Sequence, residues 1–146
     1  MKNYLNNKQI NDYQQLGVIV VKGIFKDWIE TLKVGFDKVL AEPSFHGREN
    51  VAPGSPGRFF EDYCNWQRIE EFKECIFKSP AAQIISEATG SKSVQLFHEH
   101  IFIKDAGTQK ETPWHQDMPY YCIDGNQTGS FWIPLDKVEK NNNLKL

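Results

Sequence analysis

One stretch of sequence decides the fold of this chain: SVQLFHEHIFIK, residues 93–104. It is rich in β-branched and aromatic residues, which favour extended structure. A second run of this kind, FWIPL at residues 131–135, follows it, whereas the sequence before residue 90 shows apolar residues at helical spacing. Helices therefore come first and strands later, an order that predicts an α+β fold or a helix-decorated β-sandwich.

The expected helices occupy much of the first ninety residues. Apolar spacing predicts them at residues 6–16, 26–42, 67–77 and 80–90. Gly17 and Gly90 suit the left-handed position that ends a helix. The run VIVV at residues 18–21 predicts a strand buried on both faces, and residues 43–57 are expected to form a loop rich in proline and glycine.

The composition limits the classes of function. With 146 residues, 40% of them hydrophobic, the chain has the size of one domain with a core. A net charge of −2 argues against nucleic acid as the partner, and no apolar run approaches the roughly 20 residues of a membrane helix. The polar N-terminus lacks the apolar core of a secretory signal, and three cysteines without paired spacing fit a reducing compartment. We therefore expect a cytoplasmic protein that binds neither nucleic acid nor membrane.

The densest chemistry of the chain lies in TPWHQDMPYY, residues 112–121. In an extended segment, His115 and Asp117 point the same way with Cα atoms about 6.6 Å apart, while Gln116 points away. An imidazole and a carboxylate placed in this way can converge on one metal ion and supply two of the three ligands of a non-haem Fe(II) site. The alternative is a surface histidine beside a turn aspartate. Two flanking prolines and several aromatic residues favour the rigid, partly dry site.

Residues 96–144 resemble the phytanoyl-CoA dioxygenase family of Fe(II)- and 2-oxoglutarate-dependent oxygenases. The matching pieces are FHEHIFIK at 97–104 with Gly107, TPWHQD at 112–117, YY at 120–121, DG at 124–125 and FWIPLDKV at 131–138. The most specific part is WHQD followed 15 residues after its aspartate by WIPLD. The N-terminal half resembles the family in its order of elements.

The resemblance implies a double-stranded β-helix core, the jelly roll of cupin-like proteins, with N-terminal helices packed outside. It places residues 1–146 in a single domain, with a mainly helical part at 1–90 and the first jelly-roll strands at 91–146. It also implies Fe(II) and 2-oxoglutarate as cofactors, His115 and Asp117 as iron ligands, and a small-molecule substrate. Because halogenases of this type replace the carboxylate with a small residue, Asp117 favours hydroxylation.

Two further residues of the family are absent from this sequence: a second histidine ligand on a late strand and a following arginine for 2-oxoglutarate. The segment KNNNL at 140–144 also carries Asn142 where the family has glycine. The resemblance therefore implies a C-terminally incomplete domain that is inactive as an isolated chain. The alternatives are a non-catalytic binding or structural remnant, and half of a split enzyme completed by another chain. Unpaired strand edges predict such a partner or self-association.

The resemblance also suggests roles for residues around the metal ligands. For 2-oxoglutarate binding we expect Lys104 and Trp132, although a lysine reaching solvent and a core tryptophan are the plain alternatives. Roles beside the ligands or in the substrate pocket are expected for Trp114, Gln116, His98 and Tyr120. Packing is the alternative for these four.

Two further pairs of residues leave alternatives open. His98 and His100 share one face of their expected strand and could supply a ligand, but the family uses that strand for pocket-lining or structural side chains. Tyr120 and Tyr121 either shape the substrate entrance or cover hydrophobic surface.

Overall fold

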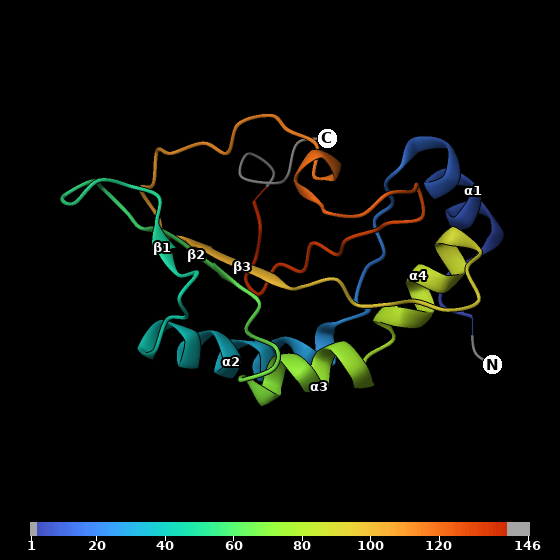
Figure 1. The fold of residues 1–146 in the computed structure, drawn as a ribbon, viewed down its shortest axis with the longest axis horizontal. Helices are drawn as coiled ribbons and strands as arrows, with labels where there is room; N and C mark the ends of the chain where they lie inside the picture. Colours follow the sequence, from blue (N-terminus) through green and yellow to red (C-terminus); the bar gives the residue numbers. More distant parts are fainter. Residues whose placement is uncertain (1–2, 140–146) are drawn as a thin grey trace.

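The computed structural model describes residues 3–139, in which helices pack beneath a small sheet. The elements, in chain order, are α1 (Asn7–Leu16), η1 (Lys26–Trp28), α2 (Ile29–Ala41), β1 (Arg48–Glu49), β2 (Phe59–Tyr63), α3 (Glu70–Lys78), α4 (Ala81–Thr89), β3 (His100–Lys104) and η2 (Met118–Tyr120). Figure 1 shows α2 and α3 along one side of the sheet, while the orange segment after β3 arcs over the other side. The structure thus confirms mixed helical and strand structure.

The three strands form an antiparallel sheet in the order β1-β2-β3. Phe60 pairs with Ile103, and both side chains join the main core with residues of α2 and α3. Phe72 of α3 is 2% exposed and packs closely on α2, because Gly35 has no side chain there. A Cβ atom at Gly35 would lie 2.5 Å from Cε1 of Phe72.

The other face of the sheet carries polar and aromatic side chains. Side chains alternate along a strand, so the cross-strand pairs on this face are Phe59 with Lys104, Glu61 with Phe102, and Tyr63 with His100. Arg48 of β1 forms an ion pair with Glu61. This is the face that the segment after β3 approaches (Figure 1).

A second, smaller core joins α1 and α4. Leu5, Ile84 and Ala88 are its buried members. The predicted glycine caps are confirmed, because Gly17 ends α1 and Gly90 ends α4, both with left-handed backbone angles. The predicted helices at residues 6–16 and 26–42 are likewise confirmed, the second beginning with the short turn η1.

The predicted strand at residues 18–21 is wrong. This run has no regular secondary structure. Ile19 and Val21 pack against the smaller core, whereas Val20 is 77% exposed. The run was expected to be buried on both faces, but only alternate side chains are covered and no strand pairs with it.

The predicted extended runs after residue 90 form less strand than expected. Of residues 93–104, only the last five form β3, and residues 131–135 form no strand. Ile133 and Leu135 pack against the main core. Pro134, between them, has no N–H to donate to a neighbouring strand. The jelly roll therefore stays a prediction, and the segment at 140–144 lies outside the described residues.

The sequence prediction missed β2, whose sequence is FFEDY. Its two acidic residues are not typical of a buried strand. In the structure, each of them has a charged or hydrogen-bonding partner nearby in space. Glu61 pairs with Arg48, and Asp62 accepts hydrogen bonds from the backbone N–H groups of Ser44 and Tyr63, each at 2.7 Å. Within residues 3–139, no helix is long and apolar enough to cross a membrane.

Candidate metal centre

The side chains of His115 and Asp117 face each other on the segment after β3. Nε2 of His115 lies 3.3 Å from Oδ1 of Asp117, and both side chains are about half exposed. Asp117 has helical backbone angles (φ −72°, ψ −36°) and begins the turn η2. The extended backbone predicted for the motif therefore ends before Asp117. The two side chains meet nonetheless.

The imidazole of His115 is oriented by the backbone. Its Nδ1 lies 2.8 Å from the carbonyl oxygen of Pro113. A carbonyl oxygen only accepts hydrogen bonds, so in the neutral imidazole this contact assigns the hydrogen to Nδ1 and leaves a lone pair on Nε2. The lone pair of Nε2 therefore faces a carboxylate oxygen of Asp117.

This donor pair fits a divalent metal ion. Two acceptor atoms that face each other need a proton or a cation between them. For metal–ligand bonds of about 2.1 Å at a right angle, two neighbouring donor atoms lie about 3.0 Å apart. The observed separation of 3.3 Å is close to this value. A neutral imidazole and one carboxylate are also the ligand types that non-haem Fe(II) uses.

Tyr121 supports the carboxylate from its other side. Its hydroxyl group donates a hydrogen bond to Oδ2 of Asp117 at 3.4 Å. The ring is half-buried and lies edge-on to the rings of Phe97, at 5.0 Å between centroids, and of His98, at 6.0 Å. Tyr120 differs, because it is 79% exposed and its ring lies 6.4 Å from that of His115.

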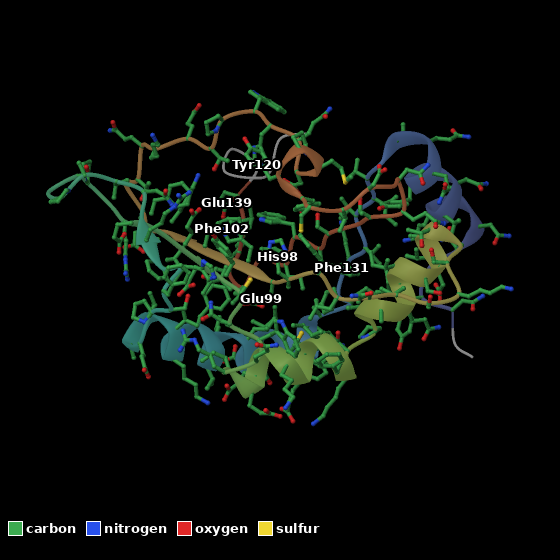
Figure 2. The ribbon with its side chains drawn as sticks, in the orientation of Figure 1. His98, Glu99, Phe102, Tyr120, Phe131 and Glu139 are labelled. Atoms are coloured by element: carbon green, nitrogen blue, oxygen red, sulfur yellow. The ribbon has the colours of Figure 1, made fainter. Side chains whose placement is uncertain are left out.

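His98 lies between the sheet and the segment that carries the metal-ligand pair (Figure 2). Burial lowers the pKa of its imidazole, and the nearby His100 lowers it further, whereas the charge of Asp117 opposes this shift. The predicted pocket residue thus lies within electrostatic reach of a predicted ligand. Glu99, its neighbour in Figure 2, accepts hydrogen bonds from the backbone N–H groups of Asn65 and Trp66.

Lys104 connects the end of β3 to the segment that leads into the motif. Its ammonium group donates hydrogen bonds to Oγ1 of Thr112 at 3.0 Å and to the carbonyl of Lys110 at 3.3 Å, and it lies over the ring of Phe59. Burial lowers its pKa, against the opposing charge of Glu111. Its observed role is therefore to hold this segment against the sheet.

The remaining predicted residues have exposed side chains. Trp114 is 75% exposed, Gln116 is exposed, and Trp132 is 42% exposed. Neither Lys104 nor Trp132 forms a hydrogen bond or ion pair with His115 or Asp117 in the described structure. The roles proposed for these residues stay predictions.

Within residues 3–139, no three histidine, cysteine, aspartate or glutamate side chains are grouped closely enough to hold a metal ion.

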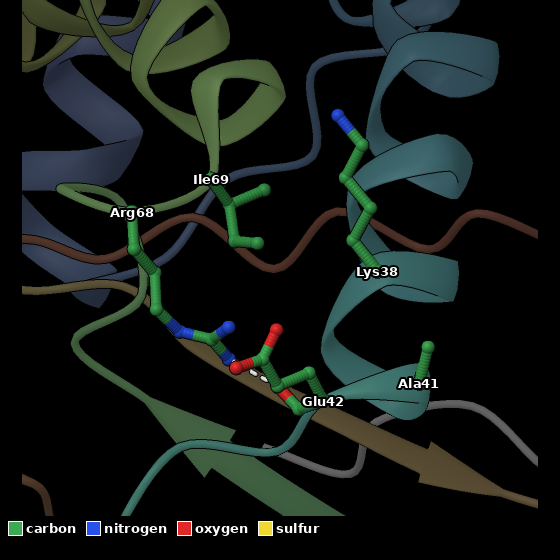
Figure 3. A pocket seen from close by; sticks show the side chains of 5 residues that line it. All are labelled: Lys38, Ala41, Glu42, Arg68 and Ile69. Atoms are coloured by element: carbon green, nitrogen blue, oxygen red, sulfur yellow. Dashed lines mark hydrogen bonds between the residues drawn. The ribbon is translucent and has the colours of Figure 1, made fainter.

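Figure 3 shows a hollow of about 430 Å³ at the C-terminal end of α2. There Arg68 donates a hydrogen bond to the carbonyl of Glu42 at 2.8 Å, and another to Asn65 at 2.8 Å. These contacts hold the end of the helix, so this hollow is structural.

Comparison with known proteins defines the class. A family model described as phytanoyl-CoA dioxygenase (PhyH) matches residues 13–143. Because this match covers most of the chain, the protein belongs to the phytanoyl-CoA dioxygenase family, as its sequence motifs predicted. No curated protein and no solved structure matches significantly.

Two supporting contacts went unrecognised in the sequence. The role of the Pro113 carbonyl cannot be read from side-chain types. The hydrogen bond from Tyr121 to Asp117 had a signal, because the two residues are four apart across a proline-containing turn. Side chains at this spacing lie on one side of a helical turn.

Proposed function

We propose that this chain is a hydroxylase of the Fe(II)- and 2-oxoglutarate-dependent type, with His115 and Asp117 as two of its iron ligands. The observation that carries the proposal is the pair of facing donor atoms, Nε2 and Oδ1, 3.3 Å apart. Family membership supports the class of chemistry. Bound Fe(II) and 2-oxoglutarate would supply the activation of O₂ for hydroxylation of a C–H bond.

The two proposed ligands differ in charge. His115 supplies a neutral nitrogen whose orientation is set by the Pro113 carbonyl, and Asp117 supplies one negative charge. A carboxylate at this position leaves no room for a halide ligand, which supports hydroxylation over halogenation. The small-molecule substrate would approach from solvent, to which Trp114 and Tyr120 are exposed.

Lys104 and Trp132 are proposed to hold 2-oxoglutarate. Lys104 has the positive charge that a dicarboxylate needs, and it lies on the same face of the sheet as His100 and Phe102. Gln116 and His98 are proposed to flank the ligands or the substrate. The cytoplasm is the proposed location, supported by three cysteines that are all free.

A second candidate is a protein whose site is completed by another chain or by self-association. It is favoured by β3, which lies at one edge of the three-stranded sheet that the described residues form. The backbone groups along such an edge can pair with a further strand. Light scattering distinguishes the cases: a stable, monodisperse monomer would argue against pairing along β3.

The proposed function is tested by anaerobic titration with Fe(II) and 2-oxoglutarate. We expect the visible charge-transfer absorption of iron-bound 2-oxoglutarate to appear weakly with the wild-type chain and to be absent from His115→Ala. In air, we expect no succinate above that of the same variant, because two iron ligands do not complete the site. Equal absorption for both proteins would contradict the proposal.

A further inference from the structure

We propose that Tyr121 is a positioning residue that fixes the orientation of the Asp117 carboxylate for one-oxygen metal binding. This inference rests on the proposed function, since it concerns the same pair of ligands. It adds a residue to which the sequence motif assigns no part in metal binding. The argument depends on which oxygen of the carboxylate meets which neighbour.

The two oxygens of Asp117 have different partners. Oδ1 faces Nε2 of His115 at 3.3 Å, and Oδ2 accepts the hydrogen bond from the Tyr121 hydroxyl at 3.4 Å. A carboxylate whose far oxygen is held by a donor presents its near oxygen to the metal. The hydroxyl of Tyr121 therefore favours binding through Oδ1 alone.

The hydroxyl is itself held in place by the fold. The turn η2 places Tyr121 directly after it, through hydrogen bonds from Tyr120 N–H to the Asp117 carbonyl at 2.9 Å and from Tyr121 N–H to the Met118 carbonyl at 3.1 Å. The ring then packs edge-on against Phe97 and His98, which precede β3. The segment that leads into β3 therefore helps to position the hydroxyl.

His115 and Asp117 are consequently supported in the same way. Each presents one atom to the other ligand and has a second atom held from behind, Nδ1 by the Pro113 carbonyl and Oδ2 by Tyr121. Supporting partners of this kind set the orientation of metal ligands, and their loss typically lowers metal affinity about 10- to 100-fold. Pro113 acts through its backbone, so Tyr121 is the supporting partner that substitution can remove.

The test is a Co(II) titration of the wild-type chain and of Tyr121→Phe, which keeps the ring and removes the hydroxyl. Tyr4→Phe is the matched control, because Tyr4 packs against the smaller core and lies outside the candidate metal centre. We expect Tyr121→Phe to bind Co(II) about tenfold more weakly. We also expect it to change the visible absorption of bound Co(II), since the carboxylate is then free to bind through both oxygens. Tyr4→Phe should match the wild type in both.

The metal-free proteins provide a second measurement, the midpoint of thermal unfolding, which should be the same for the wild type and Tyr121→Phe. Unchanged Co(II) affinity and absorption in Tyr121→Phe would overturn the inference while the proposed function stands. Weaker binding together with a lowered metal-free midpoint would assign Tyr121 a structural role and also overturn it. Co(II) binding by the wild type no tighter than by His115→Ala would contradict the proposed function itself.

Discussion

The chain up to β3 and the segment after it are built differently. Among residues 3–139, the buried hydrophobic residues all lie between Leu5 and Ile101, whereas no residue from 102 to 139 is fully buried. The first region is held by packing, and the second carries the candidate metal centre. A packed scaffold thus presents the candidate metal centre on an exposed segment, an arrangement common for functional loops.

A few side-chain contacts hold the second region to the first. They join Lys104 with Thr112, Tyr121 with Phe97, Thr128 with Tyr13, and Phe131 with Phe25. Ile133 and Leu135 add apolar contact with the main core. The geometry of His115 and Asp117 therefore depends on these contacts and on the local turn, and much less on the buried core.

The largest expected effect separates the two regions directly. Phe72→Ala removes a ring that is 2% exposed, so it should lower the free energy of unfolding by about 3–5 kcal/mol. Trp114→Ala removes a ring that is 75% exposed and should change it by no more than about 0.5 kcal/mol. Urea unfolding measures both. A comparable loss for the two variants would show that the second region is packed as tightly as the first.

A smaller effect is expected from the buried carboxylate of Asp62. Burial opposes its charge, but hydrogen bonds from Ser44, Asn65 and the N–H of Tyr63 outweigh burial and hold the pKa below its ordinary value. Its stabilisation is therefore present above the unfolded pKa of 3.8 and is lost as the pH falls through the lower folded pKa. We expect Asp62→Asn to be about 1.5–3 kcal/mol less stable at pH 7. The difference in the free energy of unfolding between Asp62→Asn and the wild type should become smaller as the pH falls.

For Glu99, the expected dependence of stability on pH has the opposite sign, so its variant serves as a control. Burial raises its pKa, against the hydrogen bonds from the N–H groups of Asn65 and Trp66. Its stabilisation is therefore greatest below the unfolded pKa of 4.5 and is lost as the pH rises through the folded value. Relative to the wild type, Glu99→Gln should thus gain stability with rising pH across this window. Unfolding midpoints measured from pH 3 to 7 would contradict both assignments if the two variants changed in parallel.

The smallest expected effect on stability tests the contact between α2 and α3. Gly35→Ala places a methyl group against the Phe72 ring, so it should lower the free energy of unfolding by about 1–3 kcal/mol. Val34→Ala, on the exposed side of the same helix, is the control and should change it by no more than about 0.5 kcal/mol. Both are measured by urea unfolding, and a stable Gly35→Ala would show that α3 can move away from α2.

The scaffold was more predictable from the sequence than the segment that carries the site. Amphipathic spacing predicted α1 and α2, because their side chains repeat on one helical face, and Gly17 marked the end of α1. The strand β2 was not predicted, since the burial of Glu61 and Asp62 depends in part on partners distant in sequence, Arg48 and Ser44. The run at 18–21 was wrongly predicted to be a strand, because a β-branched composition does not by itself provide a neighbouring strand to pair with.

The sequence predicted that the two candidate ligands meet, but not the contacts that hold them. The spacing of His115 and Asp117 correctly indicated that their side chains could meet, although the backbone at Asp117 is helical. The carbonyl of Pro113 and the hydroxyl of Tyr121 became visible only with the turn that places them. Periodicity describes regular elements, whereas this segment is shaped by individual contacts.

The central claim is that His115 and Asp117 together bind Fe(II), and anaerobic calorimetric titration of the metal tests it most directly. His46→Ala and Asp124→Ala are the matched controls, because they remove the same side-chain types outside the pair. We predict measurable Fe(II) binding by the wild type and both controls, and its loss in His115→Ala and in Asp117→Ala. Fe(II) binding of equal strength in all five proteins would contradict the claim.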